Sequence, residues 1–171
     1  MSEDLSRHEV QTPNERQLKM LRRAIGRNDY CTLATSSAAN RPLVAGVLYA
    51  AVEGVLLVST LRGSAKARNI AENDRVAVCV PVRRYPVGPP FSVQLQGRAE
   101  ILSVEDPLIT ELHRAGRLKA ITSHGELDDP DACMVRIVPG TRVGTYGLGV
   151  SLRDILRDPI HASRSWRMSW T

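Results

Sequence analysis

The chain has 171 residues, a typical length for one domain with a single core, and its hydrophobic fraction of 43% argues against general disorder. No apolar run approaches the roughly 20 residues that a helix needs to span a bilayer, and the charged N-terminus lacks the apolar stretch of a signal peptide. We therefore expect a soluble, cytoplasmic protein with no membrane partner. The net charge of +5 and the pI near 9.5 favour anionic partners, namely nucleic acid, phosphorylated cofactors or acidic tails.

The N-terminal part of the sequence predicts a polar arm followed by an amphipathic helix. Residues 1–11 are polar, and we expect them to form a flexible arm. Thr12 is a candidate helix cap, Pro13 suits the first helical position, and Glu15 would complete a capping box. An apolar stripe then recurs at helical spacing, formed by Leu18, Leu21 and Ile25. Gly26 marks the end of this helix.

Apolar runs separated by turn signals predict six strands, at residues 30–35, 42–50, 55–60, 75–82, 91–102 and 132–138, with 141–146 as a seventh. The links between the first three are short, which implies antiparallel hairpins. The fifth strand alternates apolar and polar side chains, as expected when one face is wet. A short helix is expected after Gly63 and Ser64, and another after Asp106. Residues 83–90 are rich in proline and are not expected to pair in a sheet.

These elements predict a mainly β fold with some α, in which an antiparallel barrel of six to seven strands carries short flanking helices. The sequence has no internal repeat and no linker between domains, so we expect one barrel domain over residues 12–150 and a C-terminal tail over residues 151–171. The three cysteines are far apart and odd in number, which favours small buried side chains over disulfides. The four histidines lack metal-ligand spacing, so no metal site is expected.

The segment most informative about function is residues 59–70, which read STLRGSAKARNI. Lys66 and Arg68, with Arg62 just before them, place positive charge at the start of the short helix, where the helix dipole favours negative charge. A phosphate would resolve this conflict, because it could accept hydrogen bonds from the free N–H groups, from the Thr60 and Ser64 hydroxyls and from the ammonium group. The alternative is a basic helix end that is only solvated. The spacing alone leaves both interpretations open.

The same segment carries a family resemblance. The pattern GSxKAxxIxxNxRV over residues 63–76 resembles the cofactor-phosphate segment of the pyridoxamine 5'-phosphate oxidase-like family, the flavin-binding split barrels. The LAT at residues 33–35, followed by RP at residues 41–42, is similar to the first hairpin of that family. The GRAE at residues 97–100 is similar to its long strand. The order of the elements matches as well, and the resemblance covers residues 12–138.

The resemblance implies an FMN cofactor held at the interface of a homodimer. The residues that it places around the cofactor phosphate are Ser64 and Lys66, with Ser59, Thr60, Arg62 and Asn69 as neighbours. It places the flavin ring against the second strand, which contains Val44 and Val47. A branch of the same fold uses either FMN or a deazaflavin, coenzyme F-420, whose acidic polyglutamate tail would suit a basic surface.

The sequence also departs from the oxidases themselves. Ala65 stands where they tend to have an arginine, and the second strand lacks the basic residues that they use there. Their C-terminal signature of arginine and histidine is not recognisable in residues 141–171. These differences argue against the oxidation of pyridoxamine phosphate as the activity of this chain.

Three functional hypotheses follow. The first is an oxidoreductase, dependent on FMN or the deazaflavin, that transfers hydride with a small organic substrate. The second is a carrier or sensor of flavin, deazaflavin or haem without turnover, because no pair of residues has a spacing that demands acid–base chemistry. The third is a nucleic-acid binder that uses the arginines and tryptophans of the tail. We favour a packing role for the tail, so nucleic acid is not the expected partner.

Overall fold

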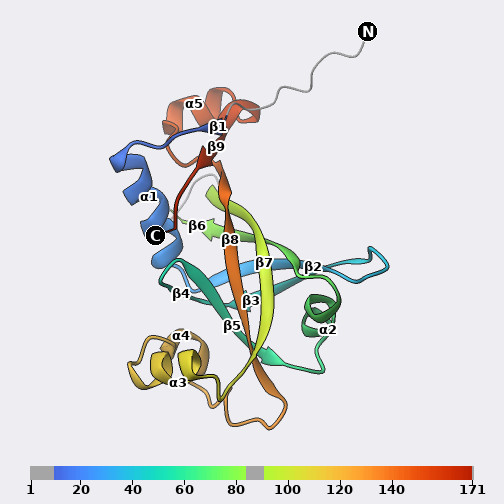
Figure 1. Cartoon of the computed structure of the whole chain (residues 1–171). Helices are drawn as coiled ribbons and strands as arrows, with labels where there is room; N and C mark the ends of the chain where they lie inside the picture. The colour runs from blue at the N-terminus through green and yellow to red at the C-terminus, as the bar shows by residue number, and fades with distance from the viewer. Residues whose placement is uncertain (1–9, 84–90, 171) are drawn as a thin grey trace.

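The computed structural model describes residues 10–83 and 91–170 (Figure 1). The strands are β1 Val10–Gln11, β2 Tyr30–Ser36, β3 Pro42–Leu48, β4 Ala50–Val52, β5 Val55–Leu61, β6 Arg75–Val82, β7 Phe91–Ser103, β8 Ala132–Tyr146 and β9 Ser163–Arg167. The helices are α1 Glu15–Gly26, α2 Ala65–Glu72, α3 Pro107–Arg114, α4 Lys119–Thr122 and α5 Leu152–Arg157, with a 3-10 turn at Ile160–Ala162. The fold is mainly β with short helices around the sheet, as predicted.

The nine strands of the described residues form one curled sheet in the order β1-β9-β8-β7-β6-β2-β3, with β5 between β4 and β8. All paired strands are antiparallel except β1 and β9. The first half of β8 pairs with β5 and its second half with β9, while β7 follows β8 for most of its length (Figure 1). β3 contacts β5 without a ladder. This arrangement is the predicted split barrel.

The two strands predicted at residues 132–138 and 141–146 are a single strand, β8. Pro139 would be expected to end a strand, but it lies beside a shift of register, opposite Gly97 of β7. The two backbones approach closely there, since a Cβ on Gly97 would lie 2.4 Å from the carbonyl oxygen of Val138. The irregularity accommodates the proline, and the strand continues beyond it.

The strand predicted at residues 42–50 is divided in two at Tyr49. The backbone N–H of Tyr49 donates to the carbonyl of Asp29 at 2.7 Å, and its hydroxyl donates to the carbonyl of Ile25 at 2.5 Å. These bonds turn the Tyr49 side chain into the core. The pairing of β3 with β2 therefore ends at Leu48, and residues 50–52 pair with β5 as β4. The turn between β4 and β5 has positive φ at both Glu53 and Gly54, the geometry of a two-residue hairpin.

The first helix begins at a different cap from the predicted one. Asn14, rather than Thr12, is the N-cap residue, and its side-chain oxygen accepts the backbone N–H of Gln17 at 3.0 Å. The Gln17 side chain accepts the N–H of Asn14 in return at 2.9 Å. Asn14 and Gln17 therefore form the capping box that the sequence predicted at Thr12 and Glu15. Pro13, predicted at the first helical position, lies before the cap.

Both ends of the described chain join the barrel. β9 pairs with β8 and with β1, which belongs to the predicted arm. Trp166 is buried, and its Nε1 donates to the hydroxyl of Thr145 at 2.9 Å, so this indole is not available to stack on a base. The Nε1 of Trp170 donates to the carbonyl of Gly140 at 2.8 Å. The predicted loop at residues 83–90 lies, beyond its first residue, outside the described residues.

The apolar interior has two parts. The larger fills the barrel under α1, and the smaller packs α3 and α4 against β4 and β5. Cys31 and Cys133 are buried free thiols, whereas Cys79 is partly exposed. Among the described residues, no helix is long and apolar enough to cross a bilayer, and no group of three or more His, Cys, Asp or Glu residues is placed to hold a metal ion.

Candidate functional site

The predicted anion site begins at the end of β5 and continues into α2. β8 holds the end of β5 in register, with Thr60 opposite Cys133. The chain then turns, with the N–H of Ser64 donating to the carbonyl of Leu61 at 3.0 Å. Ser64 is the N-cap of α2, and its Oγ accepts the N–H of Ala67 at 3.3 Å. The turn and cap predicted from the sequence are therefore both present, and the first turn of α2 contains no acidic residue.

Four of the predicted residues gather around this cap. The hydroxyl oxygens of Thr60 and Ser64 are 3.2 Å apart and share a hydrogen bond. Lys66 lies half-buried in the first turn of α2, and Arg62 lies exposed in the turn before it. Neither cation has a hydrogen-bond or ion-pair partner for its side chain within the described part of the chain. Burial raises the pKa of the Cys133 thiol, and the positive charges of Arg62 and Lys66 act against that rise, so both cations lie near this thiol.

The backbone adds further donors at the same place. The N–H of Ala67 is used by the cap, but the N–H groups of Ala65 and Lys66 have no acceptor within the residues that the structure describes. Two hydroxyls, two backbone N–H groups and two cations therefore lie together at the positive end of one helix dipole. This donor set fits a phosphate group, an anion that helix N-termini bind through their free N–H groups and their dipole.

One carboxylate competes for the same position. The Oδ2 atom of Asp131 accepts the N–H of Gly63 at 3.1 Å, and the backbone carbonyl of Asp131 accepts the N–H of Arg62 at 2.9 Å. Asp131 therefore places negative charge beside the two cations. Sequence reasoning missed this residue because 68 positions separate it from Gly63, and only the pairing of β5 with β8 brings them together.

Asn69 supports the site through a contact with the sheet. The amide of Asn69 donates to the hydroxyl of Thr35 at 3.0 Å, which ties α2 to β2. Thr35 is buried, so this contact is shielded from water. Ser59 is half-buried in β5, opposite Met134 of β8. Thr35 was part of the family-like hairpin pattern, but its contact with Asn69 could not be predicted from the sequence.

The two predicted ring contacts on β3 point to opposite faces. Val44 is 64% exposed on the outer face, whereas Val47 is 8% exposed and belongs to the core. Val44 shares the outer face with the exposed side chains of Tyr30 and Leu48, because Tyr30 pairs with Leu48 across β2 and β3. Gly46 lies between them, where a Cβ would lie 2.3 Å from the Tyr30 hydroxyl. Only Val44 of the predicted pair therefore offers its side chain to a ligand.

A shallow cavity of about 570 Å³ lies on this outer face of the barrel, where β2, β6, β7 and β8 run side by side. Thr32, Cys79 and Gln94 are among the residues that line it. Neither this cavity nor a larger one along α1 is lined by Ser64 or Lys66. Around the α2 cap, Arg62 is exposed, whereas Ser64 and Lys66 are half-buried.

This combination of a barrel with a capped helix after β5 agrees with a comparison at the family level. The sequence model described as "Pyridoxamine 5'-phosphate oxidase" matches residues 18–141, which include β2 to β7, α2 and the first part of β8. The chain belongs to the pyridoxamine 5'-phosphate oxidase family. None of the curated proteins compared with this family member is similar to it in sequence.

Solved structures share its fold at low identity. A haem-binding protein from Mycobacterium smegmatis is 22% identical over 82% of this chain, with a TM-score of 0.66, and this chain spans 57% of that protein. The haem storage protein HutZ from Vibrio cholerae is 17% identical over 75% of this chain and 92% of that one, with a TM-score of 0.63. An FAD-binding protein from Mesorhizobium loti is 23% identical over 72% of this chain and 87% of that one, with a TM-score of 0.58. Likeness at this level establishes the fold alone.

Proposed function

We propose that this family member is a flavin-dependent oxidoreductase that binds FMN at a homodimer interface and transfers hydride with a small organic substrate. The observation that carries the proposal is the donor set at the start of α2, where Lys66 and Arg62 flank two hydroxyls without an acidic residue in the first helical turn. Bound FMN supplies the hydride chemistry, and the protein supplies binding, orientation and electrostatics.

The residues of this chain have separate parts in that proposal. Ser64, Thr60 and Lys66 bind the phosphate, and Arg62 adds a second positive charge. Asn69 keeps α2 against β2 through its bond to Thr35, and so keeps the phosphate donors in place. The outer face of β3 around Val44 offers an apolar surface to the ring.

A second copy of the chain completes the site in this proposal. The apolar side chains of Tyr30, Val44 and Leu48 are 48%, 64% and 45% exposed on one face of β2 and β3. Large exposed apolar patches of this kind mark interaction surfaces. Arg62 is exposed and Ser64 and Lys66 are half-buried in a single chain. A second copy that covers them would shield a bound flavin from water. The deazaflavin F-420 remains the alternative cofactor, because the basic protein would attract its acidic tail.

The second candidate function is a carrier or sensor of flavin, deazaflavin or haem that does not turn over. It is favoured by the resemblance in fold to a haem-binding and a haem storage protein. Tyr49 is buried and donates to Ile25, and His113 is exposed on α3, away from both β3 and α2. His124 and His161 are also exposed and pair with neighbouring carboxylates, so the described histidines offer no axial ligand inside the barrel.

Cofactor titration separates these candidates. Purified protein is titrated with FMN, the deazaflavin and haem, and binding is followed in the absorption spectrum. We expect Lys66→Ala to weaken FMN binding by roughly tenfold, the cost of one charge-assisted hydrogen bond. Lys119→Ala removes the same charge from the exposed helix α4 and should leave the affinity unchanged.

Equal FMN affinity for the Lys66→Ala variant and the wild type would show that the phosphate does not bind at α2. Tight binding of haem, with no affinity for either flavin, would contradict the proposal and identify the protein as a haem carrier or sensor. Consumption of an electron donor and acceptor by the flavin-loaded protein identifies an enzyme. Stoichiometric binding without that consumption identifies a carrier or sensor.

A further inference from the structure

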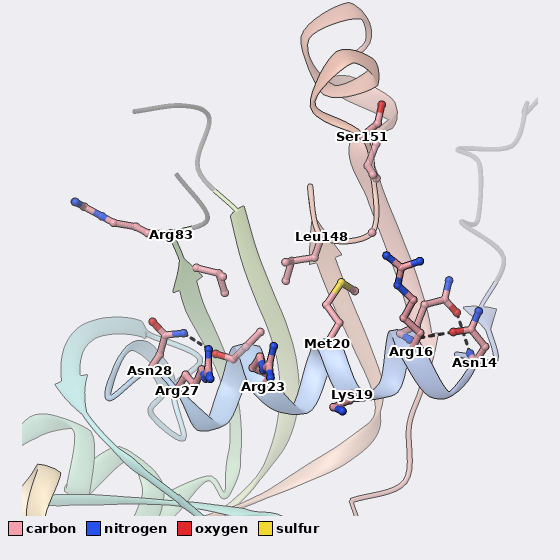
Figure 2. Close-up of a pocket in the computed structure, with 15 residues that line it drawn as sticks. Asn14, Arg16, Lys19, Met20, Arg23, Arg27, Asn28, Arg83, Leu148 and Ser151 are labelled. Carbon is pink, nitrogen blue, oxygen red and sulfur yellow. Dashed lines mark hydrogen bonds between the residues drawn. The ribbon is translucent and has the colours of Figure 1, made fainter. Parts of the chain in front are cut away.

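A second basic site lies along α1. A cavity of about 960 Å³ is bounded by α1, by the end of β6 and by residues 148–151, which follow β8 (Figure 2). Figure 1 shows α1 and α2 well apart on the barrel, so this cavity is separate from the proposed flavin site. Its volume is at the upper end of the range for small-molecule sites.

Five cations line this cavity: Arg16, Lys19, Arg23, Arg27 and Arg83. The first four occur at intervals of three to four residues along α1, so they share one side of the helix. None of the five side chains has a hydrogen-bond or ion-pair partner within residues 10–83 and 91–170. No aspartate or glutamate is among the described residues that line the cavity.

The helix itself does not explain this charge. Arg23 and Arg27 lie at the C-terminal end of α1, where cations interact favourably with the helix dipole. Arg16 and Lys19 lie in its first half, where they gain nothing from it. Like charges three or four residues apart on a helix also repel one another. A bound anion would remove that repulsion along the whole series.

The other polar groups of the cavity are already engaged. Asn14 and Gln17 bond to each other in the capping box, and the amide of Asn28 donates to the carbonyl of Ala24 at 2.6 Å. The apolar lining is aliphatic and includes Met20, Val82, Leu148 and Val150. Figure 2 shows Met20 of α1 beside Leu148. The described lining contains no aromatic side chain, which removes the stacking surface that single-stranded nucleic acid uses. Recognition here therefore depends on charge.

The extent of the series indicates the ligand. Arg16 and Arg27 are eleven residues apart, which corresponds to about 16 Å along a helix. A single phosphate or carboxylate could reach only one or two of these cations. An anion that meets most of them must itself be extended and carry several charges. We propose that the α1 cavity binds a chain of linked phosphates, either free as polyphosphate or carried on a nucleotide.

Calorimetric titration of the full chain tests this proposal at about 0.15 M salt, where weak surface attraction is screened. The probes are inorganic tripolyphosphate, ATP, AMP and orthophosphate. We expect one tripolyphosphate or ATP to bind per chain. The affinity for AMP and orthophosphate should be lower by roughly tenfold or more, because these anions reach fewer cations. Tighter binding of ATP than of tripolyphosphate would identify the nucleotide as the source, and the reverse order would identify the free chain. AMP binding as tight as ATP binding would overturn the proposal.

Variants locate the site. The double variant Arg23→Ala with Arg27→Ala should lose roughly tenfold or more in affinity for tripolyphosphate. The double variant Arg114→Ala with Arg117→Ala removes equal charge from the exposed end of α3 and the turn that follows it, and should bind as the wild type does. The single change Arg16→Ala, at an exposed position, provides an independent test should the first variant fold poorly.

The remaining outcomes also decide the question. Equal losses in the two double variants would show that the protein attracts polyphosphate only through its net charge, and the proposal would fail. If a single-stranded oligonucleotide bound more tightly than tripolyphosphate, with the same dependence on Arg23 and Arg27, that result would contradict the proposal and identify α1 as a nucleic-acid-binding surface. Lys66→Ala should leave tripolyphosphate binding at α1 unchanged, so failure of the flavin site would be visible separately.

Discussion

The carboxylate of Asp131 accepts a hydrogen bond from the backbone N–H of Gly63, with 3.1 Å between the oxygen and nitrogen atoms. This bond places a negative charge at the turn that leads into α2, where the proposed cofactor would place its phosphate. The backbone carbonyl of Asp131 also accepts the N–H of Arg62, so the same residue clamps the turn to the start of β8. Asp131 thus has a structural role and an electrostatic role that act in opposite directions on phosphate binding.

Replacing only the charge separates these roles. Asp131→Asn keeps an oxygen that can accept the N–H of Gly63 and removes the negative charge from the site. We expect FMN to bind several-fold more tightly, because like-charge repulsion with the phosphate is lost. Fluorescence titration of FMN measures the change. Asp128→Asn, an equal charge change at an exposed position of the same loop, should leave the affinity unaltered. Weaker binding by the Asp131 variant would mean that the clamp depends on the charge.

The cap of α2 can be altered in a similar way. Ser64→Asp preserves a good N-cap and adds a charge that the helix dipole favours, so the free energy of unfolding should stay constant or rise. The same carboxylate would repel a phosphate, and FMN affinity should fall by roughly tenfold or more. Thermal unfolding and an FMN titration measure the two effects.

Ser64→Ala provides the comparison for that variant. It removes the cap and should lower the free energy of unfolding by about 1 kcal/mol. FMN affinity should fall with it, because one hydroxyl donor is lost. If Ser64→Asp bound FMN as the wild type does, the phosphate could not lie against the first turn of α2.

The parts of this fold that depend on local signals were predictable. The Gly63–Ser64 turn and cap follow from residue types with strong local preferences, and the alternation in β7 follows from one wet face. The contacts that decide the site are not local. Asp131 reaches Gly63 only through strand pairing, and Asn69 reaches Thr35 only when α2 folds against β2.

The C-terminal strand was missed for a related reason. β9 reads SRSWR, which is basic and lacks an apolar run, and it is stabilised by its pairing with β8 and by the buried indole of Trp166. The turn at Glu53 and Gly54 was predictable from its residue types, and both residues have positive φ. The break at Tyr49 was not, because the sequence predicts one strand over residues 42–50 where the structure has β3 and β4. A Cβ on Gly54 would lie 2.5 Å from the carbonyl oxygen of Trp170, a constraint that only the tertiary structure imposes.

The buried thiol of Cys31 predicts a loss of stability at alkaline pH. Burial, with a smaller effect from Cys79, raises the pKa of the Cys31 thiol from 9.0 to about 12. An unfolded chain releases this proton near its ordinary pKa, whereas the folded chain retains it. The stabilisation is therefore complete below pH 9 and is lost as the pH rises through the folded pKa.

Urea unfolding at increasing pH above 9 measures this loss. Cys31→Ala should reduce the fall in the free energy of unfolding over that interval, while part of the slope persists because burial also raises the pKa of Tyr49. The smaller side chain also lowers the free energy of unfolding, but by the same amount at every pH. Comparing the slopes against pH therefore removes that effect. Cys79→Ala should reduce the slope less than Cys31→Ala does, because Cys79 makes only the smaller contribution to the raised pKa of Cys31. Equal slopes for the wild type and the Cys31 variant would contradict the prediction.

The exposed face of β3 predicts that dimerisation and cofactor binding are linked. Val44 is 64% exposed in a single chain, so Val44→Lys should leave the fold intact and introduce a charge that a buried interface would have to desolvate. We expect the variant to be a monomer in analytical ultracentrifugation and to lose FMN with Ser64 and Lys66 unchanged, because the same face of β3 serves the interface and the ring. Leu156→Lys is a matched control, because Leu156 is 70% exposed on α5. That control should remain dimeric and bind FMN, and a Val44 variant that also did so would place the interface on another face.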